Sequence, residues 1–134
     1  MSYKCIREID KDKLKALYEN AGWILYIQEL PKLIKAMEES LMIISAWDDD
    51  KLVGLVRVVG DGQTIIYIQD ILVLDEYKRN GIGTNLLNQI LDKYKHVRQK
   101  VLLTNDSKET KGFYTANGFT ACDKGDLVAF VKLN

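Results

Sequence analysis

The sequence predicts a mixed α/β (α+β) domain with a mostly antiparallel sheet and flanking helices. Its 134 residues are 47% hydrophobic and 28% charged, which suits one hydrophobic core and leaves no room for a second. Three apolar runs between residues 41 and 74 are joined by short turns. An amphipathic segment then separates the last of these runs from a further strand-like run over residues 101–104. We therefore expect one domain over residues 1–134 with the element order β-α-α-β-β-β-α-β-α-β.

The first part of the chain is expected to form a strand and two helices. Residues 3–9 alternate between apolar and polar, as a half-buried strand does. Asp10 is a suitable N-cap for a helix over residues 11–21. Pro31 suits the first turn of a second helix over residues 31–40.

Three strands are expected next, over residues 41–47, 51–59 and 63–74. The acidic turn 48–50 separates the first two strands, and the glycine-containing turn 60–62 separates the last two. Connections this short make neighbouring strands antiparallel.

The remaining elements alternate between helix and strand. Helices are expected over residues 82–95 and 107–117, and a last strand over residues 127–133. The short apolar run 101–104 is typical of a strand buried in a parallel pair. Because a helix separates it from the strand 63–74, we expect these two strands to be parallel.

Charge and composition exclude several classes of function. Lysine and arginine number 19, as do aspartate and glutamate, so a nucleic-acid binder with a global positive field is not expected. The zero net charge conceals a positive segment, because residues 78–111 hold eight basic and three acidic residues. Such a segment suits an anionic ligand.

Metal and membrane binding are not expected either. Cys5, Cys122 and His96 are too few to form a Cys/His zinc site. No apolar run approaches the roughly 18 residues that span a bilayer, and the first residues lack the apolar core of a signal peptide. We therefore expect a soluble, cytoplasmic protein.

The segment that follows the strand 63–74 has the features of an anion site. Gly81 and Gly83 allow an anion to approach the backbone without a Cβ in the way. The N–H groups at the start of a helix point outward with the positive end of the helix dipole. Lys78 and Arg79 add donors for charge-assisted hydrogen bonds.

Two well-known phosphate motifs do not fit this segment. No Gly-Lys-Ser/Thr follows, so it is not a P-loop. Leu86 stands where a dinucleotide-binding fingerprint needs its third glycine.

The segment instead resembles motif A of the GNAT superfamily of acyl-CoA-dependent N-acetyltransferases, which is usually written Arg/Gln-x-x-Gly-x-Gly/Ala. Here it reads Lys78-Arg79-Asn80-Gly81-Ile82-Gly83. Lysine at the first position keeps a donor but lacks the planar fork of arginine. A second element, Phe113-Tyr114-x-x-x-Gly118-Phe119, looks like the family's Phe-Tyr-x-x-x-Gly-Phe motif. The resemblance covers residues 41–119 well.

The resemblance implies that acetyl-CoA is the cosubstrate and that the sheet splays between its two parallel strands. The pantetheine arm would lie in this gap against the strand backbone, where one N–H group would also stabilise the oxyanion. The diphosphate would bind the loop 78–84. The residues assigned to the cofactor in this way are Ile71, Leu72, Val73, Lys78, Arg79, Asn80, Gly81, Ile82, Gly83, Thr84 and Asn105.

For catalysis, the resemblance assigns Tyr114 as the general acid that protonates the coenzyme A sulfur; the alternative is that Tyr114 only packs beside Phe113. Asp70 is either a general base or a structural residue, because a carboxylate inside an apolar strand needs a partner or a function. Glu29 or water relays are further candidates for the base.

The amine acceptor is expected to bind near the N-terminal helices. The candidate residues are aromatic or acidic: Trp23, Tyr26, Glu29 and Trp47. The alternative is that these aromatic residues only pack between helices and sheet.

Two classes of function therefore remain open. The first is an N-acetyltransferase that transfers an acetyl group from acetyl-CoA to a primary amine of a small molecule or peptide, in a ternary complex. The second is a non-catalytic acyl-CoA sensor or regulatory module. A homodimer is possible by analogy with family members of this size.

Overall fold

The computed structural model describes all residues from 1 to 134 and contains a five-stranded sheet in the order β1-β2-β3-β4-β5. The four strands β1 to β4 pair antiparallel in succession, whereas β4 and β5 are parallel. The predicted fold class and the predicted parallel pair are thus confirmed. The strands are β1 (Ser2–Lys4), β2 (Met42–Asp48), β3 (Lys51–Gly60), β4 (Ile65–Val73) and β5 (Gln99–Leu102).

The chain forms two compact units, Met1–Leu102 and Leu103–Asn134. The first unit holds the whole sheet and the helices α1 (Lys11–Asn20), α2 (Ile24–Gln28), α3 (Leu30–Glu38) and α4 (Ile82–Lys93). It also holds the 3-10 turn η1 (Asp75–Tyr77), whereas the second unit holds α5 (Lys108–Ala116) and the 3-10 turn η2 (Cys122–Lys124). The expectation of one domain over residues 1–134 stays a prediction.

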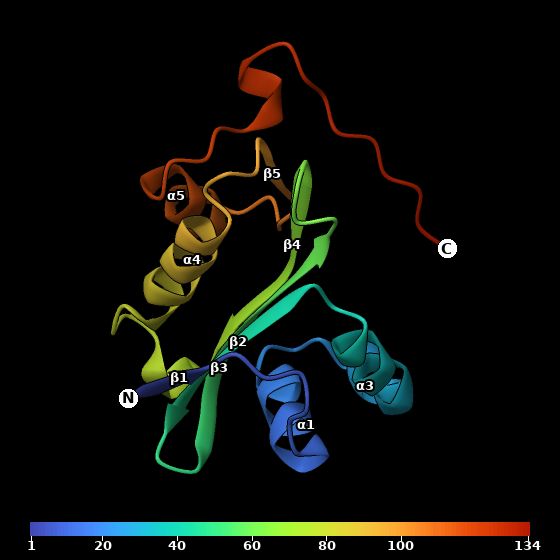
Figure 1. Cartoon of the computed structure of the whole chain (residues 1–134), viewed down its shortest axis with the longest axis vertical. Coiled ribbons are helices and arrows are strands. Elements are labelled where there is room, and N and C mark those ends of the chain that lie inside the picture. The colour runs from blue at the N-terminus through green and yellow to red at the C-terminus, as the bar shows by residue number, and fades with distance from the viewer. The chain divides into compact units, whose positions relative to one another are not determined.

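Helices cover both faces of the sheet in the first unit. Figure 1 shows α4 on one face, and α1 and α3 on the other. The central strand β3 is buried from Leu52 to Val58. Gly54 allows α4 to pack closely, because a Cβ there would lie 3.1 Å from the Leu72 carbonyl oxygen and 3.2 Å from Ile82 Cγ2. The core therefore lies on both sides of β3.

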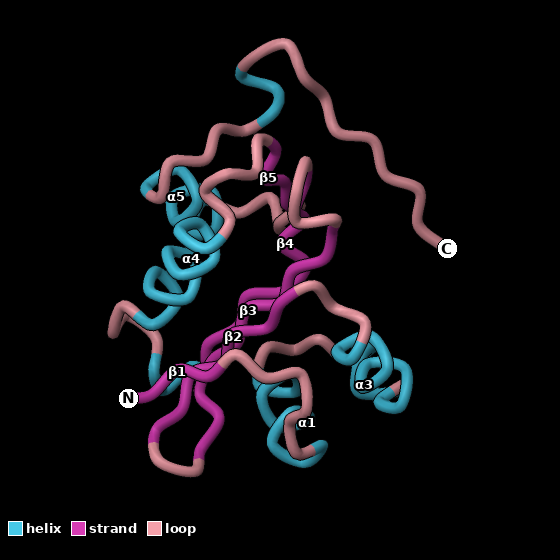
Figure 2. The backbone as a smooth tube through the Cα atoms, in the orientation of Figure 1, coloured by secondary structure: helices cyan, strands magenta, loops and turns pink.

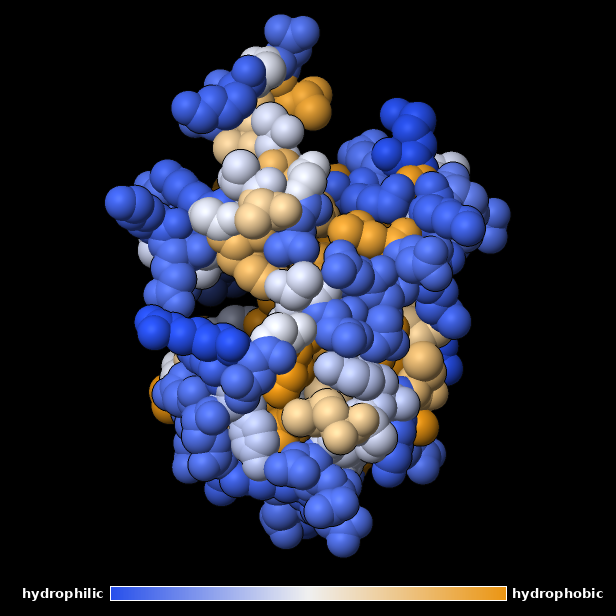
Figure 3. Space-filling view, turned by 90° about the vertical axis from the view of Figure 1, so that its left-hand side faces the viewer, coloured by the Kyte–Doolittle hydropathy of each residue, from blue (hydrophilic) through white to orange (hydrophobic).

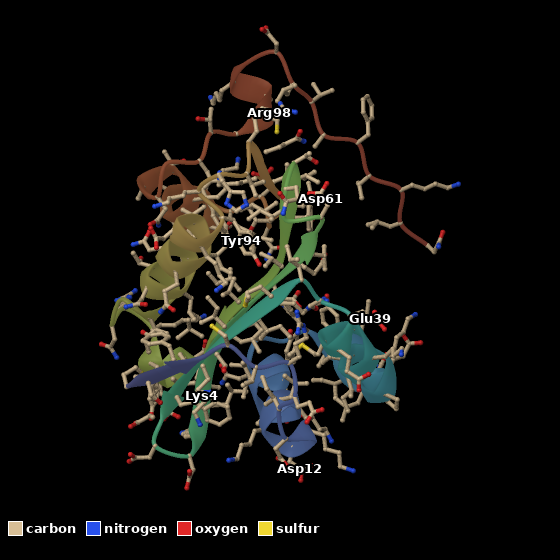
Figure 4. All side chains as sticks on the ribbon, viewed as in Figure 1. Lys4, Asp12, Glu39, Asp61, Tyr94 and Arg98 are labelled. Carbon is tan, nitrogen blue, oxygen red and sulfur yellow. The ribbon has the colours of Figure 1, made fainter.

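Two of the turns and helix ends follow directly from the local sequence. Asp10 caps α1 as predicted, because its carboxylate accepts the N–H groups of Asp12 and Lys13 at 3.2 Å each. Asp61, labelled at the turn between β3 and β4 in Figure 4, accepts the N–H groups of Gln63 and Thr64 at 2.8 Å each. Short polar side chains thus satisfy backbone donors at both places.

The N-terminal strand is shorter than the predicted 3–9, and it ends at Lys4. Beyond Lys4 the backbone no longer pairs with β2. The Arg7 guanidinium instead donates hydrogen bonds to the carbonyls of Ser40 and Leu41, just before β2, at 2.9 and 3.0 Å. In addition, the short helix α2 occupies the aromatic stretch that follows α1, where no element was predicted.

The predicted strand over residues 127–133 was wrong. Figure 2 draws the chain after η2 as loop up to the C-terminus, and no strand is formed there. A run of apolar, β-branched and aromatic residues favours a pleated, half-buried surface, but a strand forms only where another strand edge pairs with it. No helix of the structure is long and apolar enough to cross a membrane.

Candidate active site

One edge of β4 is unpaired over its last residues. Parallel pairing with β5 ends at Ile68 and Leu102, whereas β4 continues to Val73 against β3 on its other side. The strand β5 begins and ends two residues earlier than the predicted 101–104, which is why the pairing stops here. Residues 69–73 therefore present a strand edge without a neighbouring strand.

The register identifies which backbone groups face this open edge. The Leu74 N–H donates to the Val53 carbonyl of β3 at 2.9 Å. Because backbone groups alternate in direction along a strand, Leu72 also turns its N–H toward β3. The N–H and carbonyl groups of Ile71 and Val73 consequently point to the open edge.

The start of α4 lies shortly after this edge and is not capped. No side chain accepts from its first N–H groups, and the first intrahelical bond runs from Asn85 to the Gly81 carbonyl at 2.9 Å. The N–H groups of Ile82, Gly83 and Thr84 therefore have no partner within the helix. In contrast, α1 and α5 are both capped by a side chain.

The loop before α4 has an unusual backbone conformation at two positions. Arg79 and Gly81 both have left-handed backbone conformations, with φ of 68° and 78°. A positive φ is uncommon for a residue with a side chain, so the loop is held in a specific conformation at Arg79. Left-handed residues also occur in backbone concavities that bind anions.

The charges around the helix start are positive or neutralised. Lys78 Nζ lies 2.9 Å from Asp75 Oδ1, and both side chains are exposed. Arg79 is exposed and forms no ion pair, and the first turn of α4 contains no acidic residue. Asn80 and Thr84 are also exposed. The arrangement is able to receive a phosphate group.

Asp70 lies at the centre of a buried polar network in the first unit. Its carboxylate accepts from Arg57 Nε at 2.8 Å, from the Tyr18 hydroxyl at 2.8 Å and from the Tyr26 hydroxyl at 3.2 Å. Asp70 is 1% exposed and Arg57 is 5% exposed. Three donors thus occupy the two carboxylate oxygens.

A bulge lies next to this network. Arg57 pairs with Asp70, but the next residue, Val58, pairs with Ile68, so that Gln69 is the extra residue of β4. The Gln69 side chain donates to the Tyr26 hydroxyl at 3.1 Å. The network therefore joins the bulge of β4 to α2.

Burial changes the titration of these groups. It raises the pKa of Tyr18 and of Tyr26, and the neighbouring Asp70 raises both further. Burial by itself would lower the pKa of Arg57, but the ion pair with Asp70 raises it above its ordinary value. Both tyrosine hydroxyls and the guanidinium therefore stay protonated as donors at neutral pH.

The predicted acceptor residues do not all gather in one place. Trp23 and Tyr26 are half-buried and contact each other and Tyr18, with ring centroids 5.1 to 5.9 Å apart. Glu29 is exposed and pairs with Lys32 at 3.6 Å. Trp47 is buried beneath the ammonium groups of Lys4 and Lys13, which lie 4.8 and 5.4 Å from its ring centroid.

Sequence analysis missed Tyr18, Arg57 and Gln69 in this network. The available signal was a single arginine inside the apolar run 51–59, opposite a single carboxylate in the next strand. A charge on each of two adjacent buried strands indicates an ion pair.

In the second unit, Tyr114 lies on α5 between two aromatic rings. Its ring centroid is 5.0 Å from that of Phe113 and 5.8 Å from that of Phe119, both in edge-to-face arrangements. Burial raises the pKa of Tyr114 to about 12, so its hydroxyl is protonated at neutral pH. Asn105 precedes α5 and is exposed, and its carbonyl accepts a hydrogen bond from the Thr110 hydroxyl at 2.7 Å.

Comparison with known proteins assigns the chain to a family. The model of the acetyltransferase (GNAT) domain matches residues 19–131, a range that includes parts of both units. The chain belongs to the GNAT acetyltransferase family. The resemblance seen in the sequence is thus confirmed.

Individual relatives agree with this GNAT assignment. A solved GNAT-family acetyltransferase from Streptococcus pneumoniae is 33% identical, has a TM-score of 0.88 and covers 99% of this chain and 97% of its own. An uncharacterized ycf52-like N-acetyltransferase from Prochlorococcus marinus is 28% identical over 96% of this chain and 73% of its own length.

A third GNAT structure contains a ligand. It is the PaiA N-acetyltransferase from Thermoplasma acidophilum in complex with coenzyme A, with 19% identity, a TM-score of 0.73 and coverage of 90% of this chain and 91% of its own. At this identity the likeness concerns the fold. GNAT proteins use acetyl-CoA, and this chain shares their architecture.

Proposed function

We propose that this GNAT protein transfers the acetyl group of acetyl-CoA to a primary amine of a small molecule or peptide, by direct attack in a ternary complex. The observation that carries the proposal is the open edge of β4 followed, shortly after, by the uncapped start of α4. One continuous stretch of chain thereby offers backbone groups to an amide-containing arm and then to a diphosphate.

The pantetheine arm binds along the open edge of β4 in this proposal. Ile71 and Val73 offer N–H and carbonyl groups to its amides, whereas the backbone of Leu72 is turned to β3. One of the free N–H groups also donates to the thioester carbonyl and stabilises the negative charge that develops on its oxygen.

The phosphates bind at the start of α4. The unpaired N–H groups of Ile82, Gly83 and Thr84 donate to the diphosphate, and Arg79 adds a charged donor. Lys78 would exchange its exposed pair with Asp75 for a phosphate, which costs little because an exposed ion pair contributes only about 0–1 kcal/mol. The coenzyme A complex of the Thermoplasma relative supports this cosubstrate.

Tyr114 supplies the proton for the leaving group. The neutral amine nitrogen attacks the thioester carbonyl carbon, the C–S bond breaks, and the thiolate takes the proton of the Tyr114 hydroxyl. The proton released by the amine passes to water, and Tyr114 is reprotonated from solvent. The hydroxyl carries its proton at neutral pH and is therefore present in its acid form. The support for the role is the match of Phe113-Tyr114-x-x-x-Gly118-Phe119 to the family's motif.

Asp70 is a structural residue in this mechanism. Its oxygens accept hydrogen bonds from Arg57, Tyr18 and Tyr26, and the residue is 1% exposed, so burial and three protein donors separate it from a bound amine. The amine acceptor contacts Trp23 and Tyr26, whose half-buried rings suit the apolar body or the charge of an alkylamine.

Thiol release from acetyl-CoA, measured across a panel of primary amines, tests the proposal. We expect release with at least one amine and tight binding of coenzyme A by calorimetry. Binding without release for any amine would favour the non-catalytic acyl-CoA sensor. Failure to bind coenzyme A would overturn both functions.

A further inference from the structure

The stretch of chain that joins the open edge of β4 to the start of α4 has little burial of its own. Its last bond to the sheet runs from the Leu74 N–H to the Val53 carbonyl, and the next buried residue is Ile82, which is 3% exposed. Among residues 75–81, which lie between these points, only Tyr77 is half-buried and the others are exposed. The conformation of this stretch therefore depends on a few contacts with other elements.

The 3-10 turn η1 makes these contacts. The Asn20 side chain, on the last residue of α1, accepts the Asp75 N–H at 3.0 Å. The Tyr77 hydroxyl donates to the carboxylate of Asp48, the last residue of β2, at 2.7 Å. Both ends of η1 are thus tied to elements that lie far from it in the sequence.

Lys51, the first residue of β3, adds a third contact to η1. Its ammonium group pairs with Glu76 and lies 5.5 Å from the centroid of the Tyr77 ring. The ion pair is exposed and contributes little by itself, but an ammonium group over an aromatic ring also favours one position of that ring. The turn between β2 and β3 therefore holds Tyr77 by its hydroxyl and by its ring.

The residues that follow η1 have no such support. No hydrogen bond joins Lys78, Arg79 or Asn80 to another element, and Lys78 pairs only with Asp75 of the same stretch. The φ of 68° at Arg79 is strained for a residue with a side chain, so its surroundings have to maintain it.

Apolar packing does not replace the missing hydrogen bonds. Figure 3 views the molecule from the side on which Figure 1 draws α4, and hydrophilic residues predominate on this face. Residues 78–81 therefore depend for their position on η1 before them and on the buried Ile82 after them.

We propose that Tyr77 and Asn20 are positioning residues for the phosphates of the cosubstrate. By fixing η1 they keep residues 78–81 in the binding conformation before the ligand arrives, so that binding does not include the entropy cost of ordering the loop. Both residues act through the backbone of the loop and not by contact with the ligand. The inference rests on the proposed function, because it takes this loop as the phosphate site.

Titrations with two ligands, followed by nuclear magnetic resonance, test the proposal. Coenzyme A carries the phosphates, whereas acetyl-pantetheine lacks them. For Tyr77→Phe and for Asn20→Ala we expect the Kd of coenzyme A to increase about fivefold to tenfold, as for the ordering of about one further residue. The Kd of acetyl-pantetheine should change less than about twofold. Unchanged binding of coenzyme A, or equal losses for both ligands, would overturn the proposal.

Matched variants isolate the hydrogen bond between Tyr77 and Asp48. Asp48→Ala should weaken coenzyme A binding as Tyr77→Phe does, and the double variant no further, because each change removes the same bond. Asp48→Asn keeps an acceptor for the hydroxyl and should bind like the wild type. Asp50→Ala removes the same charge from the same exposed turn, and Tyr3→Phe removes the hydroxyl of another half-buried tyrosine, so both should also bind like the wild type. Additive losses in the double variant would contradict the proposed role of this bond.

Amide hydrogen exchange of the ligand-free protein separates this inference from the proposed function. The N–H groups of Asp75, Tyr77 and Lys78 donate hydrogen bonds in the wild type and should exchange about fivefold faster in Tyr77→Phe, at an unchanged melting temperature. Unchanged exchange would overturn the inference whatever the titrations show. A wild type that does not bind coenzyme A would overturn the proposed function, and the positioning role with it.

Discussion

At the scale of single residues, Tyr114 provides the sharpest test of the mechanism. Tyr114→Phe keeps the packing against Phe113 and Phe119 but removes the proton donor. We expect kcat to fall about tenfold or more, while the Kd for acetyl-CoA changes less than about twofold. Steady-state kinetics and calorimetry measure the two quantities.

The control for this variant is Tyr3→Phe, which removes the hydroxyl of a half-buried tyrosine on β1. Its kcat should equal that of the wild type. Because the pKa of Tyr114 is raised to about 12, its deprotonation should not reduce the wild-type rate until the pH exceeds about 11. Unchanged turnover of Tyr114→Phe at every pH would contradict the role of Tyr114.

Substitutions of Asp70 and its partners test whether this carboxylate is structural or acts as the catalytic base. Asp70→Ala leaves the Arg57 guanidinium buried without its partner, so the free energy of unfolding should fall by about 3–5 kcal/mol. Tyr18→Phe removes one donor only and should cost about 1–3 kcal/mol. Urea unfolding measures both losses.

The double variant Arg57→Met/Asp70→Leu removes the carboxylate without leaving a charge unpaired. We expect it to recover much of the stability lost in Asp70→Ala. Where it is folded, it should keep turnover within about tenfold of the wild type. A stable double variant whose turnover is abolished would identify Asp70 as the base.

At the scale of elements, a negative charge at the start of α4 should have opposite effects: it should stabilise the helix and weaken the binding of coenzyme A. Thr84→Glu places a negative charge in the first turn, which favours the helix dipole and repels a diphosphate. We expect the melting temperature to stay the same or rise, and the Kd for coenzyme A to increase about tenfold. Thermal unfolding and calorimetry separate the two effects.

Asn88→Glu is the matched control, because Asn88 is exposed one turn further along α4. Its effect on coenzyme A binding should be clearly smaller, since the dipole and the free N–H groups are confined to the first turn. Equal losses in both variants would mean that the helix start is not the phosphate site.

The turn between β3 and β4 gives a pH-dependent contribution to stability. Hydrogen bonds from the Thr64 hydroxyl and from the backbone of Gln63, Thr64 and Ile65 hold the pKa of Asp61 well below its usual range. A carboxylate with a lowered pKa in the folded state stabilises the fold above its unfolded pKa of about 4, and this contribution is lost as the pH falls below that value.

Asp61→Ala should therefore melt at a lower temperature than the wild type at pH 7, and the difference should shrink below about pH 4. Thermal unfolding between pH 2 and pH 7 measures it. A difference that stays constant over this range would show that the ionised carboxylate does not hold the turn.

At the scale of the whole molecule, a net charge of zero coexists with a locally positive segment between Lys78 and Lys111. Binding of coenzyme A should weaken about threefold or more between low and high salt, because salt screens exposed charges. Acetyl-pantetheine, which lacks the phosphates, should bind with little dependence on salt. Equal salt dependence for both ligands would contradict a phosphate site.

Much of the fold was predictable because its signals are local. The apolar runs with their short turns, the Asp10 cap and the glycines at the start of α4 each act over a few residues, and the structure confirms the cap and the sheet pairing that the runs and turns indicated. The wrong strand over residues 127–133 has the same origin, because its pattern is also local. Whether a strand forms depends on an edge elsewhere.

The sequence by itself determined the family and the expected phosphate loop, since glycine spacing and the end of a strand need no distant partner. Only the tertiary structure showed that Arg57, Tyr18 and Tyr26 surround Asp70. It also showed that the pairing of β4 with β5 stops at Leu102 and that the apolar side chains of residues 127–133 are exposed. The physical reason is that ion pairs, strand edges and burial are properties of contacts between residues far apart in the chain.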